Sequence, residues 1–307
     1  MDQIVLTKSL RTVGYGSHEI QRMRQRGDLV PVRRGAYARD RPEDQTVEQA
    51  HRQLILATVP QLADGAVVSH ASAAVLHGLP IWSSAIDRMH LTRDRSGGGR
   101  RRPVVHVHGA PLTAADLALI DGVAVTSLVR TVLDLARTVP MEQAVAAGDR
   151  ALANGLSPLD LERRLVSMEH WPGVRRARRV VGFLDPRSES AGESVSRVRM
   201  LEDDLPIPDL QREVLGPDGR LVARVDFCWD EQKTIGEFDG KVKYGRLLKP
   251  GQSIEKVIFD EKVREDALRD LGWQVVRWLW RDLYRRGTLR DRVLRAFARS
   301  GGDLTPR

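Results

Sequence analysis

Two short apolar runs in the last third of the chain constrain its fold most. They are Leu221–Trp229 and Thr234–Phe238, and the charged segment Asp230–Lys233 separates them. Apolar runs of this length around a polar break are typical of two antiparallel strands joined by a loop. Helical patterns precede and follow these runs, so the sequence predicts a mixed sheet flanked by helices and an α+β fold class.

Acidic residues lie at matching positions on the two expected strands. Side chains alternate faces along a strand, so Glu237, Asp239 and, if the strand persists, Lys241 project from one face, and Asp226 can join them from the neighbouring strand. Close carboxylates repel unless a cation lies among them, and Mg²⁺ accepts such ligands together with a phosphate oxygen. The pattern indicates metal-assisted phosphodiester hydrolysis. The alternative is an ordinary turn, because Asp239-Gly240 is a strong turn dipeptide.

The order of these residues resembles a known nuclease family. D-x10-E-x-D-G-K from Asp226 to Lys241, then Glu261–Asp266 and Leu271–Arg277, resembles the nuclease-like domain related to very-short-patch-repair endonucleases, in the PD-(D/E)XK superfamily. The resemblance extends from Ser188 to Ala298. It implies that Asp226 and Glu237 are ligands of Mg²⁺.

Three further residues enter through this resemblance. Asp239 would be a third carboxylate, Lys241 would take the lysine's place, and Glu193, on the expected helix before the sheet, would be the helix-borne acid. The E-x-K pattern of the superfamily needs lysine at position 239, where this chain has aspartate. Either Asp239-Gly240-Lys241 serves as the motif or the catalytic lysine is displaced.

The overall charge favours a polyanionic partner. Lys and Arg number 49 against 41 Asp and Glu, which gives +8 and a sequence pI near 10.0, a balance that points to nucleic acid first. The single cysteine, Cys228, excludes an intramolecular disulfide. The uncharged stretch 65–86 is long enough for a bilayer but contains histidines, a proline and serines, so we expect no membrane span and a cytoplasmic protein.

The first 40 residues predict a winged helix-turn-helix. Asp2–Thr12 has helical spacing, a Gly-rich turn follows, Ser17 is a good N-cap, His18–Arg26 is a basic helix, and Leu29–Tyr37 alternates like a small hairpin. Helix, turn, basic helix and hairpin are the parts of this DNA-binding motif.

Arginines in this segment are the expected contacts to double-stranded DNA. Arg22 and Arg26 share one helix face at i, i+4 and would enter the major groove. Arg33 and Arg34, near the hairpin tip, would meet phosphates or the minor groove. The alternative is a solvated basic helix and loop.

Residues 41–184 form the expected middle domain. Strands are expected at Asp87–Thr92 and Pro103–His108, with the Arg- and Gly-rich segment between them as a hairpin loop. Together with the winged helix, this region resembles the AbiEi family of antitoxin-like transcriptional regulators. The matching residues are Ser69–Ala74, His77–Pro80, Val125–Ser127 and Arg130–Asp134. The resemblance implies a DNA-binding repressor, commonly paired with a toxin.

The histidines predict no zinc site. His106 and His108 share one strand face, and His70 and His77 are close in sequence, but no third ligand at metal spacing is evident and no cysteine assists. We expect these histidines to be structural.

The segment from residue 185 to 307 is the expected nuclease-like domain. Its long helix Ser253–Leu271 carries Lys262 and Arg264, which would face DNA or solvent. Three functions follow from the sequence: a regulator of the AbiEi type with a nuclease-like domain, an active Mg²⁺-dependent endonuclease targeted by its winged helix, or a nuclease fold without activity that serves protein contacts.

Overall fold

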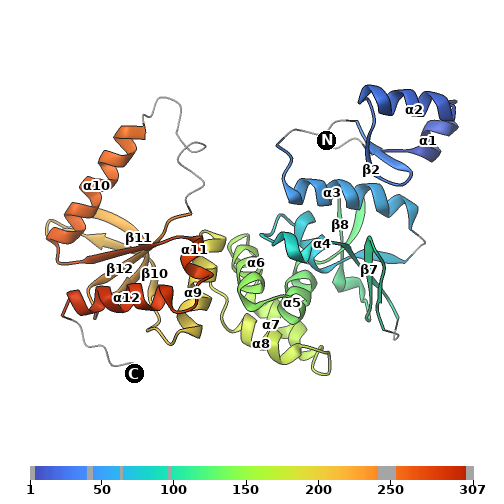
Figure 1. The fold of residues 1–307 in the computed structure, drawn as a ribbon. Helices are drawn as coiled ribbons and strands as arrows, with labels where there is room; N and C mark the ends of the chain where they lie inside the picture. Colours follow the sequence, from blue (N-terminus) through green and yellow to red (C-terminus); the bar gives the residue numbers. More distant parts are fainter. Residues whose placement is uncertain (1–3, 40–43, 63–64, 96–97, 241–253, 302–307) are drawn as a thin grey trace. The chain divides into compact units, whose positions relative to one another are not determined.

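The computed structural model describes residues 4–39, 44–62, 65–95, 98–240 and 254–301. It divides into a first unit, Met1–Phe183, and a second unit, Leu184–Arg307. Both units combine helices with sheets (Figure 1), so the α+β class is confirmed. None of the helices in the described ranges has the length and apolar character needed to cross a membrane.

The first unit begins with a three-stranded antiparallel sheet and two helices. In chain order they are β1 (Ile4–Leu6), α1 (Thr7–Thr12), α2 (Ser17–Arg26), β2 (Val30–Arg33) and β3 (Ala36–Ala38), with sheet order β1-β3-β2. Leu10, Ile20 and Leu29 form the small core. The expected helix from Asp2 is wrong at its start: Ile4, Val5 and Leu6 are extended because they pair with β3.

A six-stranded sheet follows, in the order β6-β7-β5-β4-β9-β8. Its strands are β4 (Ala66–Val68), β5 (Met89–Arg93), β6 (Arg100–Arg101), β7 (Val105–Gly109), β8 (Leu117–Ile120) and β9 (Val123–Thr126). Helix α3 (Val47–Thr58) supplies Ile55, and α4 (His70–Leu76) supplies Ala73 and Leu76, to the core over this sheet. The expected hairpin between the strands of this region is wrong: β5 and β7 pair in parallel, and β6 makes the antiparallel pair with β7.

Helices α5 (Leu128–Thr138), α6 (Met141–Ala153), α7 (Pro158–Val166) and α8 (Val174–Val181) complete the first unit. Ser127 caps α5 by accepting a hydrogen bond from the backbone N–H of Arg130. The guanidinium of Arg130 is fully buried and pairs with Asp134 at 3.0 Å and Asp116 at 3.4 Å. A charged guanidinium can be buried here because the two carboxylates compensate its charge.

The second unit is a four-stranded sheet with order β10-β11-β12-β13. Its elements are α9 (Ala191–Glu202), β10 (Asp209–Leu215), β11 (Leu221–Trp229), β12 (Thr234–Phe238), α10 (Ile254–Asp270), β13 (Gln274–Trp278), α11 (Trp280–Leu283) and α12 (Thr288–Arg299). The pairs are antiparallel except β12 with β13, which are parallel. Strands β11 and β12 coincide with the two apolar runs of the sequence.

Helix α9 approaches the end of β12 closely at Gly192. A Cβ added there would lie 1.9 Å from Cε1 of Phe238, so only glycine fits. This contact brings the next residue, Glu193, beside the carboxylates of the sheet.

Candidate functional site

Helix α2 presents its arginines to solvent. Gly16, not Ser17, is the N-cap, because its N–H donates to Glu19 Oε2 at 2.7 Å, and Gly27 ends the helix in the left-handed region at φ 85°. Arg22 is exposed, and exposed Arg26 pairs with Asp28 at 3.1 Å. The exposed residue Ser17 borders a hollow of about 470 Å³ that Arg11 and Arg24 also line.

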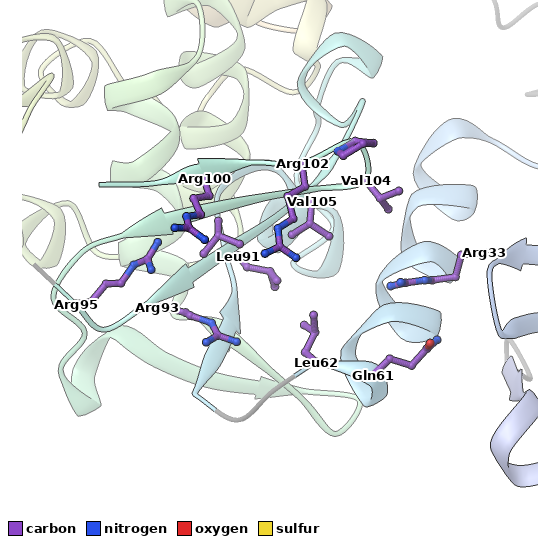
Figure 2. Close-up of a pocket in the computed structure, with 12 residues that line it drawn as sticks. Arg33, Gln61, Leu62, Leu91, Arg93, Arg95, Arg100, Arg102, Val104 and Val105 are labelled. Carbon is purple, nitrogen blue, oxygen red and sulfur yellow. The ribbon is translucent and has the colours of Figure 1, made fainter. Parts of the chain in front are cut away.

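A second basic feature lies where the hairpin β2–β3 approaches the six-stranded sheet. Arginines and the apolar residues Leu91, Val105 and Val107 line a hollow of about 610 Å³ there. Figure 2 shows the arginines around Leu91 and Val105. The arginines of this hollow are Arg33, Arg93, Arg95, Arg100 and Arg102. None of the described lining residues is acidic. Guanidinium groups gathered around one hollow attract an anion, and they bind phosphate or carboxylate oxygens through paired hydrogen bonds.

Of the two hairpin arginines, Arg33 lines this hollow and Arg34 does not. Arg34 is exposed at the turn after β2, where the alternation of the strand has ended. The arginines of this hollow from β5, β6 and their flanks come from the segment that the sequence marks as Arg-rich. Sequence reasoning did not join them to Arg33, because that juxtaposition depends on tertiary packing.

The carboxylates of the second unit meet at the centre of its sheet. The β11–β12 register pairs Phe227 with Gly236, and one further step sets Asp226 opposite Glu237 on the same face. Asp226 Oδ2 accepts from the backbone N–H of Phe238 at 2.9 Å. Gln211, which the sequence did not single out, donates to Glu193 at 3.0 Å and to Asp226 at 3.3 Å.

The carboxyl group of Asp226 has a strongly raised pKa. Burial is the largest cause that raises the pKa of Asp226 to about 7, and the neighbouring carboxylates of Glu193 and Glu237 raise it further. The hydrogen bond from the N–H of Phe238 acts in the opposite direction. Glu193 is itself held by the start of its helix, since Ser190 Oγ donates to it at 2.6 Å and the N–H of Glu189 at 2.9 Å.

Glu237 is neutralised by arginines of its own unit. Arg277, opposite it on β13, lies 2.8 Å away, and Arg264 of α10 lies 3.0 Å away. Arg264 also pairs with Glu261 at 2.7 Å. Arg264, expected to face DNA or solvent, has a side chain that is 31% exposed and a guanidinium that pairs with these two carboxylates. Its contact with DNA stays a prediction. Arg277 was not predicted, because its role depends on the parallel pairing of β12 with β13.

The remaining predicted site residues are placed as follows. Lys262 is exposed on α10. Asp239 is half-buried just beyond β12, and its N–H donates to the carbonyl of Trp278 at 2.9 Å. Lys241 lies outside the described residues. Among the described residues, Glu193, Asp226 and Glu237 do not form a trio of ligand atoms within 4.8 Å of one another.

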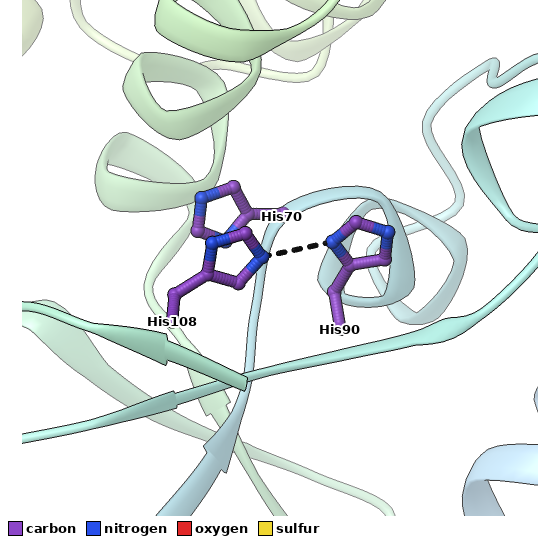
Figure 3. A group of neighbouring side chains, drawn as sticks. All are labelled: His70, His90 and His108. Carbon is purple, nitrogen blue, oxygen red and sulfur yellow. Dashed lines mark hydrogen bonds between the residues drawn. The ribbon is translucent and has the colours of Figure 1, made fainter. Parts of the chain in front are cut away.

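Histidines of the first unit do form such a trio (Figure 3). One ring nitrogen each of His70, His90 and His108 lies within 4.8 Å of the others. His90 Nδ1 and His108 Nε2 share a hydrogen bond of 3.0 Å, and the rings of His70 and His108 stack with centroids 3.7 Å apart. The expectation that no third ligand joins the histidines is wrong, because His90 on β5 lies beside the stacked rings of His70 and His108.

Burial keeps these imidazoles neutral. Desolvation is the largest cause of a lowered pKa for His70, to about 4, and for His90, to about 3, and it also lowers the pKa of His108. Asp134, 3.9 Å from Nδ1 of His70, opposes the shift. A hollow of about 560 Å³ opens onto all three histidines.

Comparison with known proteins finds relatives along most of the chain. No family model matches. Uncharacterized proteins MT2308 and Rv2248 of Mycobacterium tuberculosis, from strains CDC 1551 and H37Rv, are each 28% identical over 279 residues, covering 89% of this chain and 94% of the relative. The crystal structure of the M. tuberculosis Rv2827c protein aligns with a TM-score of 0.38 and 20% identity over 70% of this chain and 84% of that one. That structural similarity is too low to carry an argument.

Proposed function

We propose that the chain is a double-stranded DNA-binding regulator of the AbiEi antitoxin type, with a nuclease-like second unit. The observation that carries the proposal is that arginines of the first unit gather at two places, on the exposed face of α2 and around the hollow that includes Arg33. Phosphates dominate the affinity of such surfaces for DNA.

Helix α2 and the arginine-lined hollow would contact different parts of the DNA. Helix α2 carries Arg22 and Arg26 one turn apart on a solvent-exposed face, where a helix can enter a major groove. The arginine-lined hollow gathers guanidinium groups from the hairpin and from the six-stranded sheet, and guanidinium groups can bind phosphate. Duplex DNA bound at both places would contact the protein through its sugar-phosphate backbone and through the edges of its bases.

Salt-dependent binding tests this proposal. Fluorescence anisotropy with a labelled DNA duplex should give an affinity that falls with salt, and each lost phosphate contact lowers the slope of log K against log salt by about 0.9. The variant Arg22→Ala/Arg26→Ala should bind at least about tenfold more weakly, which equals about 1.4 kcal/mol.

The matched control is Arg163→Ala/Arg220→Ala. It removes the same charge from side chains that are 77% and 88% exposed and pair only at 3.6 and 3.5 Å with Asp160 and Asp218. Equal weakening in both double variants would mean that α2 makes no specific contribution, and the assignment would be withdrawn.

A second candidate function is Mg²⁺-dependent DNA cleavage by the second unit. It is favoured by the placement of Asp226 opposite Glu237, beside Glu193, and by the raised pKa of Asp226, which a bound cation would lower again. Asp226 and Glu237 would hold the ion, which would activate water. Arg264 and Arg277 would then have to release Glu237. If they do not, the unit serves protein contacts.

Nicking of supercoiled plasmid distinguishes these alternatives. With Mg²⁺ or Mn²⁺ an active enzyme converts supercoiled DNA to nicked circles, and Asp226→Ala and Glu237→Ala abolish the conversion. Wild-type protein that cleaves nothing in either metal, or variants that cleave as well as wild type, would exclude these acids as a nuclease site. DNA binding by the first unit is measured separately and does not depend on this result.

A further inference from the structure

The histidine trio lies at the junction of three elements of the first unit. His70 begins α4 one residue after β4 ends, with Ser69 between them, His90 is on β5, and His108 is on β7. Strand β5 pairs with both β4 and β7. It therefore brings His70 and His108, which are 38 positions apart in the sequence, close to each other. Strand pairing therefore fixes the backbone positions of His90 and His108 and of the strand that leads into His70.

The backbone of His70 adds a second sign of a specialised position. Its φ is 52°, in the left-handed region that non-glycine residues seldom occupy. Such a conformation costs on the order of 1 kcal/mol and is typical of functional sites. The hydroxyl oxygen of Ser69 lies 3.0 Å from Nδ1 of His70, and the ring of His108 stacks against the His70 ring.

The distances are close to those of a coordination sphere. Two imidazole nitrogens bound to one tetrahedral Zn²⁺ are about 3.3 Å apart, because each bond is about 2.0–2.1 Å long. The nitrogens of His90 and His108 are already 3.0 Å apart. The third nitrogen lies within 4.8 Å of both, and imidazole rings rotate broadly about χ2.

We propose that His70, His90 and His108 form a site for a divalent transition metal of the zinc class. Neutral imidazole is a preferred ligand of Zn²⁺ and Co²⁺, whereas Mg²⁺ prefers oxygen. Three protein ligands leave the fourth position for water or a substrate, as in open zinc sites. The 560 Å³ hollow, lined also by Asp87, Arg101 and Gln143, connects that position to solvent.

Cobalt binding tests the site directly. Full-length protein is stripped with a chelator, and Co²⁺ is added while the visible absorption is recorded; Zn²⁺ is then titrated by calorimetry. Wild type should bind one ion per chain and develop the absorption bands of four-coordinate Co²⁺. His90→Ala and His108→Ala should each lose more affinity than the about 10- to 100-fold that removal of an outer-shell partner costs. Both residues are only partly buried, so these variants are expected to fold.

His106→Ala and His170→Ala are the matched controls. His106 lies beside His108 with ring centroids 3.9 Å apart but belongs outside the trio, and His170 is exposed. Each control should bind Co²⁺ within about tenfold of wild type, less than the loss expected for a ligand. His70→Asn is the third ligand variant, because asparagine tolerates the left-handed region. The proposal is overturned if wild type binds no Co²⁺ or Zn²⁺, or if a control loses as much affinity as the ligand variants while circular dichroism shows them folded.

Discussion

Acidification should unfold the first unit through its buried histidines. His51 and His70 are 4% and 3% exposed, and burial is the main cause that lowers the pKa of each from 6.5 to about 4. The unfolded chain takes up these protons near pH 6.5, whereas the folded chain resists them until about pH 4. Between those values the unfolded state binds more protons, so the stability is complete above pH 6.5 and is lost as the pH falls toward 4.

The size of the effect follows from the two pKa values. One histidine with a pKa of 6.5 unfolded and about 4 folded loses about 2 kcal/mol of stabilisation between pH 7 and pH 5. His51 and His70 together therefore remove about 4 kcal/mol, which is a large share of the 5–15 kcal/mol typical of a whole protein. His90, with a pKa lowered to about 3, acts in the same direction.

Hydrogen exchange measures this loss locally. Peptides from α4 and α5, analysed by mass spectrometry in the presence of a chelator, report the opening free energy of the first unit at each pH. The double variant His51→Gln/His70→Asn should reduce the difference between pH 7 and pH 5 by about 4 kcal/mol. Glutamine can keep the 2.8 Å contact that His51 makes with Ser72. An unchanged difference in the variant would refute the assignment of the acid sensitivity to these two imidazoles.

Two further predictions concern the second unit. Asp226 has a folded pKa raised from 3.8 to about 7, so the folded state binds more protons between those values; this unit should gain about 2 kcal/mol from pH 7 to pH 5, and Asp226→Asn should remove that gain in exchange of β11 peptides. Gly192→Ala should lower stability by about 1–3 kcal/mol or more through the clash with Phe238. Thermal unfolding measures the loss, and Gly98→Ala, whose added Cβ meets nothing within 4 Å, should unfold like wild type; a Gly192→Ala melting temperature equal to that of Gly98→Ala would contradict the packing.

Most elements of secondary structure were predictable from the sequence alone. Strands Leu221–Trp229 and Thr234–Phe238 have the bounds that their apolar runs predict, and helix α3 begins one residue after Thr46. These features depend on local causes, namely hydrophobic spacing, caps and turn residues, which a single sequence displays. The failures at Ile4–Leu6 and at the expected hairpin between β5 and β7 come from pairing with distant strands, which local pattern does not encode.

The candidate sites divide in the same way. The sequence by itself determined which residues carry charge and chemistry: the acids Asp226 and Glu237 and the arginines of α2 are where their spacing placed them. Only the tertiary structure decided their partners, because strand order and register bring together side chains that are remote along the chain. It placed both Arg277 and Arg264 against Glu237, and it brought His90 together with His70 and His108. The sequence states which residue stands at each position, but the distances between side chains in a site depend on long-range packing.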